Sequence, residues 1–374
     1  MKIGVLTLRL HKNYGGILQN YALTKVLEML GHEVETINIF WDIRPKGLNK
    51  VKILLKRIVK KYVLQRKIDI WEEERILAED VYTTVNTKRF KTQYNHLSKE
   101  VYVVPGANFS PVNNLYDAIV VGSDQVWRPR YTMGVKKYFL DFISNPKIKK
   151  LSYAASFGTE INEYSKEDAA VCGKLIERFD GVSVREKSGI KLIREDLKWN
   201  VRPQHHIDPT LLLDPADYMF KGMVKEPSNN LFVYILDIDL QKQKVIDQIA
   251  NYLSISPNQL LAKGLRNEGQ DIIPPVEDWL SGIMNASFVI TDSFHGCVFS
   301  ILFHKPFIVY GNSERGMARF DSVLKTFGLE DRFINNPTQL TTNLIDAQID
   351  WEKVESVRRK EKERSIKYLT ELLK

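Results

Sequence analysis

The stretch 287–310 combines residues that could perform chemistry with the elements that would position them. It reads as a strand, a polar turn, an apolar helix and a second strand. His295 lies in the first turn of the helix, beside Gly296, and Ser293 precedes it. A helix that begins directly after a strand presents free backbone N–H groups, and these attract anions. The stretch therefore predicts an anion site with an imidazole beside it, although an exposed histidine at a plain helix start is the alternative.

Polar residues also follow predicted strands in the N-terminal half. The first loop ends in Asn13, Gly15 and Gly16, and the paired glycines would let a ligand approach the backbone, although the spacing is not that of a dinucleotide-binding loop. Asp124 and Arg185 each follow a strand, where open α/β sheets bind ligands. The structural alternatives are a tight turn for the glycines, a loop cap for Asp124 and a salt bridge for Arg185.

Further cations lie in the C-terminal half. Lys305 follows the apolar helix, and Arg315 and Arg319 are four residues apart, so they would share a helix face. These arginines could pair with an anionic substrate, or only with Glu314 and solvent. Together with His295 they favour group transfer from a phosphorylated or phosphate-linked donor, with the imidazole as general acid or base. The residues alone leave a nucleotide-sugar glycosyltransferase and a transferase of a smaller phosphorylated donor equally open.

The alternation of strands and helices predicts the α/β class with parallel sheets. A proline-containing loop region, 203–230, separates two such series. We therefore expect a Rossmann-like domain at 1–220, a second one at 221–350, and a final helix at 351–374 that packs back across the molecule. The two domains would face each other across a cleft that holds the candidate residues.

The composition is that of a globular chain, with 374 residues, 44% of them hydrophobic and 27% charged. No apolar run approaches the ~20 residues that a membrane-spanning helix requires, and the start, 1–8, reads as a strand rather than a signal peptide. Cys172 and Cys297 fall in apolar helices and are too few for a disulfide framework or a zinc cluster. We expect buried thiols, a cytoplasmic location and no bound metal.

The net charge of +8 is concentrated in one segment, 46–67, which carries nine basic residues and no acid. The segment is predicted to be a helix with Val51, Leu55 and Ile58 on one face and basic side chains on the other. Such a helix could lie on an anionic membrane surface, or it could pack on its own domain with a solvated basic face. The rest of the chain is nearly neutral, and no base-reading or stacking groups indicate nucleic-acid binding.

Six short motifs, in this order, resemble those of the polysaccharide pyruvyl transferases: NYGGILQNYAL (13–23), VVGSDQVW (120–127), SYAASFG (152–158), SVREKSG (183–189), DPTLLL (208–213) and TDSFHG (291–296). The resemblance covers roughly residues 1–330. It implies a fold similar to the B-type glycosyltransferases, with two Rossmann-like domains. It also implies transfer of pyruvate from phosphoenolpyruvate, as a ketal, to a sugar of a surface or capsular polysaccharide or of its lipid-linked precursor. No cofactor is implied beyond phosphoenolpyruvate as co-substrate.

The resemblance also implies roles for individual residues. His295 would be the central catalytic residue, and Asp124 is assigned to the acceptor side as a second one. The C-terminal domain would hold phosphoenolpyruvate and the N-terminal domain the acceptor. The donor-binding set is expected to be Arg185, Lys305, Ser293, Arg315 and Arg319, and the acceptor or loop set Asn13, Tyr14, Gly15, Gly16 and Gln19. If the acceptor is lipid-linked, the segment 46–67 could hold the enzyme at the inner face of the membrane.

Overall fold

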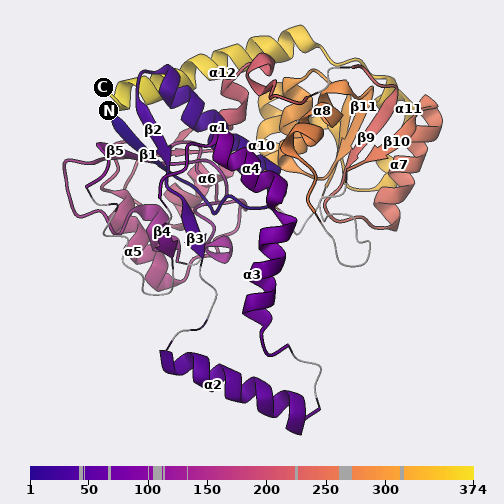
Figure 1. Ribbon diagram of the computed structural model, residues 1–374. Helices are drawn as coiled ribbons and strands as arrows, with labels where there is room; N and C mark the ends of the chain where they lie inside the picture. The colour runs from indigo at the N-terminus through magenta and orange to yellow at the C-terminus, as the bar shows by residue number, and fades with distance from the viewer. Residues whose placement is uncertain are drawn as a thin grey trace.

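The molecule is built on two parallel sheets, one in each half of the chain (Figure 1). The structure is a computed structural model, and it describes residues 1–41, 45, 47–65, 69–99, 101–103, 112, 114–132, 134–223, 226–260, 272–311 and 316–374. The first sheet has the strand order β2-β1-β5-β6 and the second β10-β9-β11-β12-β13. The predicted α/β class with two Rossmann-like units is therefore confirmed.

Along the chain, helices follow the strands of the first sheet, and they pack against it. Its elements are β1 (Lys2–Leu6), α1 (Tyr14–Met29), β2 (Glu33–Thr36), α4 (Val85–Tyr94), β5 (Ala118–Val121), β6 (Lys149–Ser152), α5 (Lys166–Ile176), β7 (Ser183–Val184), α6 (Lys187–Lys191) and β8 (Gln204–His205). Single bridges from Leu151 to Gly181 and from Ala155 to Val184 continue the sheet toward β7, which pairs with β8. All these pairings are parallel, as expected where helices connect successive strands.

The second sheet repeats this plan. Its elements are β9 (Asn230–Tyr234), α7 (Leu240–Leu253), β10 (Ser256–Gln259), α8 (Val276–Asn285), β11 (Phe288–Thr291), α9 (Phe294–Leu302), β12 (Phe307–Tyr310), α10 (Ala318–Phe327), β13 (Phe333–Ile334) and α11 (Thr342–Asp346). In register, Val289 of β11 lies beside Phe232 of β9 and Phe307 of β12. The candidate histidine therefore follows the carboxyl end of the central strand of this sheet.

The alternation of side chains across each strand divides the core into three parts. Ile3 and Val5 of β1 face one side of the first sheet, where α1 lies, and Leu6 faces the other. In the second sheet Phe232 faces the same shared core as α1, while Leu231 faces α7. Because one continuous core takes side chains from both sheets, the two units are packed together and not merely linked.

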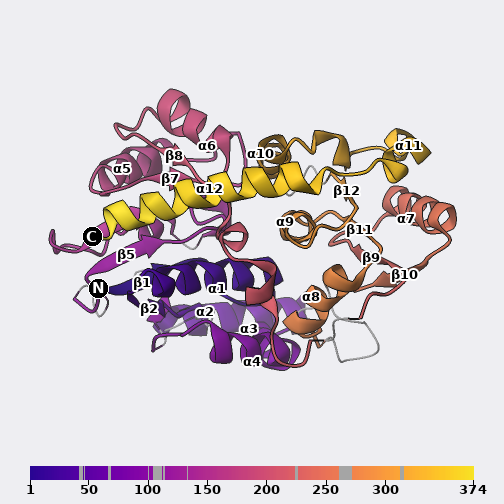
Figure 2. The same cartoon turned by 90° about the horizontal axis from the view of Figure 1, so that it is seen from above.

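The last helix, α12 (Trp351–Leu372), runs across both units and brings the two termini near each other (Figure 2). Arg358 donates to the carbonyl oxygens of Leu211 and Leu213 at 3.1 and 3.0 Å. Near the other end of the helix, Tyr368 donates to the carbonyl oxygen of Ser152 at 2.9 Å. These contacts tie the last helix to the stretch that follows β8 and to β6, and α10 and β12 lie beside its N-terminal half in the same view.

The segment between β2 and β5 leaves the main body and returns to it, so that only its middle part projects (Figure 1). It holds β3 (Ile39–Trp41), α2 (Gly47–Ile58), a short π-helix η1 (Val59–Val63), α3 (Glu72–Thr83) and β4 (Val101–Val103). The sequence predicts one strand over 33–39, but the structure has β2 and a separate β3 that pairs with β4. Figure 1 shows α2 standing apart from the two sheets at the far end of α3.

Candidate active site

His295 lies at the start of α9, where the carboxyl edge of the second sheet meets the first unit. Ser293 is the N-cap of α9, and its Oγ accepts from the Gly296 amide at 3.4 Å. Thr291 Oγ1 donates to the carbonyl oxygen of Tyr234 at 2.8 Å and so ties the turn to β9. A Cβ on Gly296 would lie 2.3 Å from Thr291 Oγ1, so glycine is required for α9 to start this close to its strand. The His295 side chain is buried.

The first turn of α1 faces this histidine from the other half of the molecule. A Cβ on Gly15 would lie 1.9 Å from His295 Nδ1, and a Cβ on Gly16 would lie 3.2 Å from Asp124 Oδ2. The two glycines therefore let α1 approach both predicted catalytic side chains closely. Asp124 itself has a φ of 82°, in the left-handed region that few residues other than glycine adopt. Such backbone strain tends to persist at functional sites.

Asp208 is the buried carboxylate nearest to the imidazole. Its Oδ2 lies 3.4 Å from His295 Nε2 and accepts from Arg185 Nη1 at 2.9 Å. Its Oδ1 accepts from the amide and hydroxyl of Thr210 at 3.0 and 2.7 Å. Burial alone would raise the pKa of Asp208. The positive charges of His295 and Arg185 and the hydrogen bonds outweigh burial, so the pKa lies well below its ordinary value.

Arg185 is held in the interior by a set of polar partners. Its Nη1 donates to Ser123 Oγ at 3.2 Å as well as to Asp208, and its Nε donates to Glu186 Oε1 at 3.1 Å. The guanidinium also lies over the ring of Phe294, 4.5 Å from its centre. Arg185 is thus placed as a partner of Asp208, and it is not among the residues that line the cavity beside His295, where direct contact with a donor was expected.

A cavity of about 350 Å³ opens beside His295 between the two units. Both predicted catalytic side chains and both helix starts contribute to its wall. The lining residues are Leu8, Lys12, Asn13, Asp124, Gln125, Tyr131, Tyr234, Leu236, Asp292, Ser293, Phe294, His295 and Arg319. Their polar and aromatic side chains, and the volume, are typical of a small-ligand site.

Among the described residues, Arg319 is the arginine that lines this cavity. It comes from α10, its side chain is only 9% exposed, and its guanidinium lies 5.5 Å from the centre of the Phe294 ring. Burial and the positive charge of Arg185 lower the pKa of Arg319 to about 10. The side chain is therefore still a cation at neutral pH, and it offers this charge in a setting with little water to screen it.

Two helix N-termini converge on the same cavity. Asn13 is the N-cap residue of α1, its side chain makes no capping hydrogen bond, and the first turn of α1 contains no acid. Ser293 occupies the same position in α9, whose first turn also has no acid. With Asn13 and Ser293 both on the wall, the partial positive charges of two helix starts point to one space, which favours an anionic ligand.

Several predicted residues are not brought to this cavity. Lys305 precedes β12, which runs parallel to β11, so it lies at the amino edge of the sheet. It is separated from His295 by the nine-residue helix α9, about 13 Å, and the prediction that it holds the donor does not fit this position. Tyr14 donates to the carbonyl oxygen of Pro274 at 2.7 Å and packs against Trp279, so it is a core residue. Gln19 is buried and donates to Thr7 Oγ1 at 3.0 Å. Arg315 lies outside the described residues.

Asp208 is a site residue whose role was not predicted from the sequence. The motif Asp208-Pro209-Thr210 reads as a turn, and the structure does place Asp208 at the cap of a short 3₁₀-helix, η6 (Pro209–Leu212). The same carboxylate faces His295, which is 87 positions later in the chain, so local patterns could not reveal the pairing. The one local signal that could have found it is its position shortly after β8, because polar groups beyond the carboxyl ends of strands form the ligand sites of open α/β sheets.

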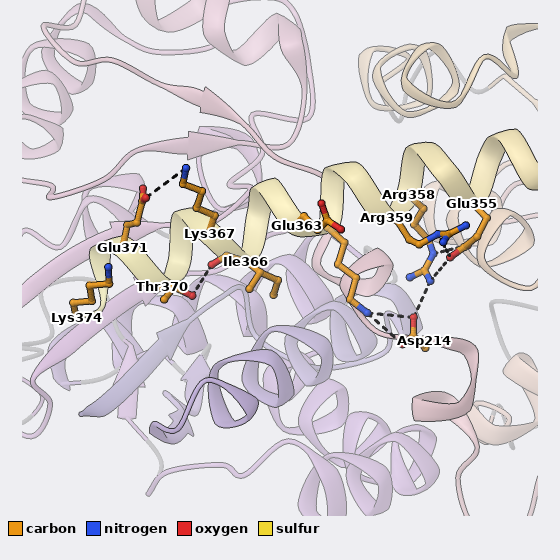
Figure 3. A pocket seen from close by; sticks show the side chains of 11 residues that line it. Asp214, Glu355, Arg358, Arg359, Glu363, Ile366, Lys367, Thr370, Glu371 and Lys374 are labelled. Atoms are coloured by element: carbon orange, nitrogen blue, oxygen red, sulfur yellow. Dashed lines mark hydrogen bonds and ion pairs between the residues drawn. The ribbon is translucent and has the colours of Figure 1, made fainter.

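A larger hollow lies elsewhere, along the outer face of α12 (Figure 3). Its charged side chains pair with one another: Asp214 accepts from Arg358 at 2.8 Å and from Lys362 at 3.2 Å, and Lys367 lies 3.8 Å from Glu371. It is a shallow surface on which most charges are paired, and its lining includes neither His295 nor any other residue of the cavity beside it, so we place the site at that cavity. Within the described residues, no group of three or more His, Cys, Asp or Glu side chains could hold a metal ion.

Solved structures of similar overall shape are nucleotide-sugar enzymes in several cases. The UDP-GlcNAc 2-epimerase of Methanocaldococcus jannaschii has 12% identity and a TM-score of 0.49, with 94% of this chain and 93% of that one covered. MnaA of S. aureus, solved with UDP, has 13% identity and a TM-score of 0.47, with 92% and 88% covered. At these values the similarities carry no argument about ligand or reaction. A comparison with curated proteins found no match.

The sequence itself matches a family. The match to polysaccharide pyruvyl transferase extends over residues 13–314. It includes Gly15, Asp124, Asp208 and His295, which meet at or beside the cavity. The chain belongs to the polysaccharide pyruvyl transferase family.

Proposed function

We propose that this protein transfers pyruvate from phosphoenolpyruvate to two hydroxyls of one sugar, forming a ketal and releasing phosphate. The observation that carries the proposal is the His295–Asp208 pair, 3.4 Å apart, beside a cavity that Arg319 and two helix starts make favourable for an anion. Membership of the family supports the same reaction class. The acceptor would be a sugar of a surface polysaccharide or of its lipid-linked precursor.

The donor-binding groups would be Arg319 and the N-termini of α1 and α9. Phosphoenolpyruvate carries a carboxylate and a phosphate, so it needs positive charge at two positions, and the guanidinium and the helix starts supply it from different sides. A cavity of about 350 Å³ suits a three-carbon phosphate ester better than a full nucleotide sugar. Arg185 would act indirectly, because it holds Asp208 in place for the imidazole.

His295 would move the protons. With Nε2 directed at Asp208, the carboxylate would stabilise a charged imidazolium, and the ring, which lines the cavity, would exchange a proton with a ligand there. The imidazolium would donate a proton to the methylene carbon of phosphoenolpyruvate, which leaves a cation-like centre at C2. The Oδ2 atom of Asp124 is directed toward the start of α1. This carboxylate would accept a proton from the attacking hydroxyl.

The bonds and protons of this scheme balance. The first sugar oxygen forms a bond to C2, and the C2–O bond to phosphate then breaks with its electron pair on phosphate. The second sugar oxygen closes the ketal on C2. Two hydroxyl protons are released: one replaces the proton given to the methylene carbon, and the other leaves with phosphate. The scheme uses no metal or redox cofactor.

Turnover tests the proposal. The protein is incubated with phosphoenolpyruvate and a panel of oligosaccharides, phosphate release is followed, and products are examined by mass spectrometry. We expect phosphate release that depends on an acceptor, and a product heavier by pyruvic acid less one water. Transfer of a sugar from a nucleotide sugar, with phosphoenolpyruvate left intact, would contradict the proposal and would identify the protein as a glycosyltransferase.

A further inference from the structure

The helix α2 and the adjoining η1 bury none of their side chains, although many of those side chains are apolar. Leu48 is 81% exposed, Val51 54%, Leu55 57% and Tyr62 67%. Leaving this much apolar surface in water opposes the hydrophobic effect, and contiguous exposed apolar patches usually mark an interaction site. The sequence left open that this helix packs on its own domain, and its exposure does not fit that alternative.

The exposed apolar residues lie on one face. Leu48, Val51, Leu55 and Ile58 follow one another at spacings of three and four, which places them along one side of a helix. The basic side chains around them are largely exposed as well: Lys50, Lys52, Lys56 and Lys61 all reach solvent. The element is thus amphipathic, with an apolar face and a cationic one.

One basic residue holds the element in position. Arg57 Nη1 donates to Glu73 Oε2 at 2.5 Å and Nη2 donates to Glu72 Oε2 at 3.0 Å. Both acids belong to the first turn of α3, so α2 is fixed to the end of that helix. The apolar face of α2 stays uncovered, and Figure 1 shows the whole element projecting from the body.

We propose that α2 and η1 dock on an anionic lipid bilayer. A bilayer surface matches both faces at once, because its acyl boundary takes the apolar face and its negative headgroups attract the lysines. The charge argument is strong here, since 46–67 contains nine basic residues and no acid. No described helix is long and apolar enough to cross a membrane, so attachment would be by this surface contact.

The docking element is coupled to the candidate active site through α3. At the end of α3 away from α2, Asp80 lies 3.1 Å from His11 Nε2 and 3.5 Å from Lys12 Nζ, and Lys12 lines the cavity. The twelve residues of α3 therefore separate the membrane contact from the cavity rim by about 18 Å. If the proposed function holds, this arrangement assigns the acceptor to the class of membrane-anchored glycans.

Vesicle flotation with the full chain tests the docking. The probes are vesicles of phosphatidylcholine alone and of phosphatidylcholine mixed with phosphatidylglycerol. We expect flotation with the mixed vesicles, weakened by high salt, and none with the neutral ones. A triple variant, Leu48→Ser, Val51→Ser and Leu55→Ser, should remain in the soluble fraction. Replacing Lys52 and Lys56 with glutamate should weaken binding by more than about fivefold per lysine.

Matched changes elsewhere on the surface serve as controls. Ile161→Ser and Leu240→Ser remove apolar side chains that are 70% and 82% exposed, and Lys353→Glu with Lys360→Glu reverses exposed charges on α12. These should float like the wild type. The proposal is overturned by absence of binding to anionic vesicles, by unchanged binding of the α2 variants, or by a dimer that the triple variant abolishes.

Stabilisation by phosphoenolpyruvate, measured without lipid, separates the two proposals. The docking variants should keep that stabilisation, because α2 does not reach the cavity. Flotation with anionic vesicles but no stabilisation by phosphoenolpyruvate would refute the proposed function and leave the membrane contact standing. Stabilisation by phosphoenolpyruvate without flotation would refute only the docking.

Discussion

Gly15 and Gly16 set how closely the first turn of α1 approaches His295 and Asp124, the predicted catalytic side chains. A Cβ on Gly15 would lie 1.9 Å from Nδ1 and 2.2 Å from Cγ of His295, so even one methyl group would force the ring or the helix to move. This contact crosses between the two halves of the molecule. The glycine pair in the first loop therefore has a specific purpose that the sequence indicated only as close approach by a ligand.

Gly15→Ala should lower pyruvyl transfer by about 10²-fold, because small displacements of catalytic groups cost rates of this order, while circular dichroism shows the fold intact. Gly122→Ala is the matched control, since the nearest atom to its new Cβ would be 3.4 Å away. The assignment fails if both variants have wild-type rates.

His295→Gln should reduce the rate by about 10²- to 10⁴-fold, the usual contribution of a general acid or base. Phosphoenolpyruvate should still stabilise the variant, because the anion-binding groups are unchanged. His304→Gln, on the residue just beyond the other end of α9, should be almost unaffected in steady-state assays. Equal losses in the two variants would mean that the imidazole at 295 has no special role.

At the scale of residues, His295 and Asp124 were predicted from the sequence as site residues that follow strands, but no role was predicted for Asp208. His295 could be predicted because strand, cap and helix are local patterns. Asp208 could not, because its partner at 3.4 Å comes from another part of the chain, and pairing across such a distance depends on how the two sheets pack.

At the scale of elements, α12 closes the molecule by covering the end of the first sheet. His206, directly after β8, is fully buried, and its ring lies 4.6 Å from that of Tyr368 on α12 and 5.9 Å from that of Tyr153. Its Nδ1 lies 3.0 Å from Ser365 Oγ. Burial, with the charge of Arg364 nearby, lowers the pKa of His206 to about 3.

This depressed pKa predicts an acid-sensitive fold. The unfolded chain binds the His206 proton near pH 6.5 and the folded chain only near pH 3, so stability falls as the pH drops through that window. The loss is about 2 kcal/mol at about pH 5. His206→Phe keeps a ring between the tyrosines and removes the titration, so its unfolding free energy, measured by denaturant titration, should change less between pH 8 and pH 5. If the unfolding free energy of the variant fell as much between pH 8 and pH 5 as that of the wild type, this prediction would be contradicted.

The direction of the strands explains why Lys305 does not lie near His295. Its sequence position, ten residues after His295, suggested proximity, but an intervening helix carries the chain to the opposite edge of a parallel sheet. The helix, its stop and the next strand were all predictable, and strand direction then separates the two residues. The exposure of α2 was not predictable, because an amphipathic pattern does not say what covers the apolar face.

At the scale of the whole molecule, the site exists only where the two units meet. His295 and Arg319 come from the second unit, and Asn13, Gly15 and Asp124 from the first. Because one continuous core joins the units, the cavity is largely formed before a ligand arrives. The two parallel sheets were predictable from the order of strands and helices, whereas their shared core depends on which face each strand turns toward the other unit.

The most direct test of the account is thermal unfolding with phosphoenolpyruvate, compared with a panel of nucleotide sugars. A ligand that binds only the folded protein stabilises it by about 2.7 kcal/mol at a hundred times its Kd. We predict stabilisation by phosphoenolpyruvate in the wild type and in Arg359→Ala, an exposed arginine on α12, and loss of the effect in Arg319→Ala. Stabilisation by a nucleotide sugar and none by phosphoenolpyruvate would contradict the central claim.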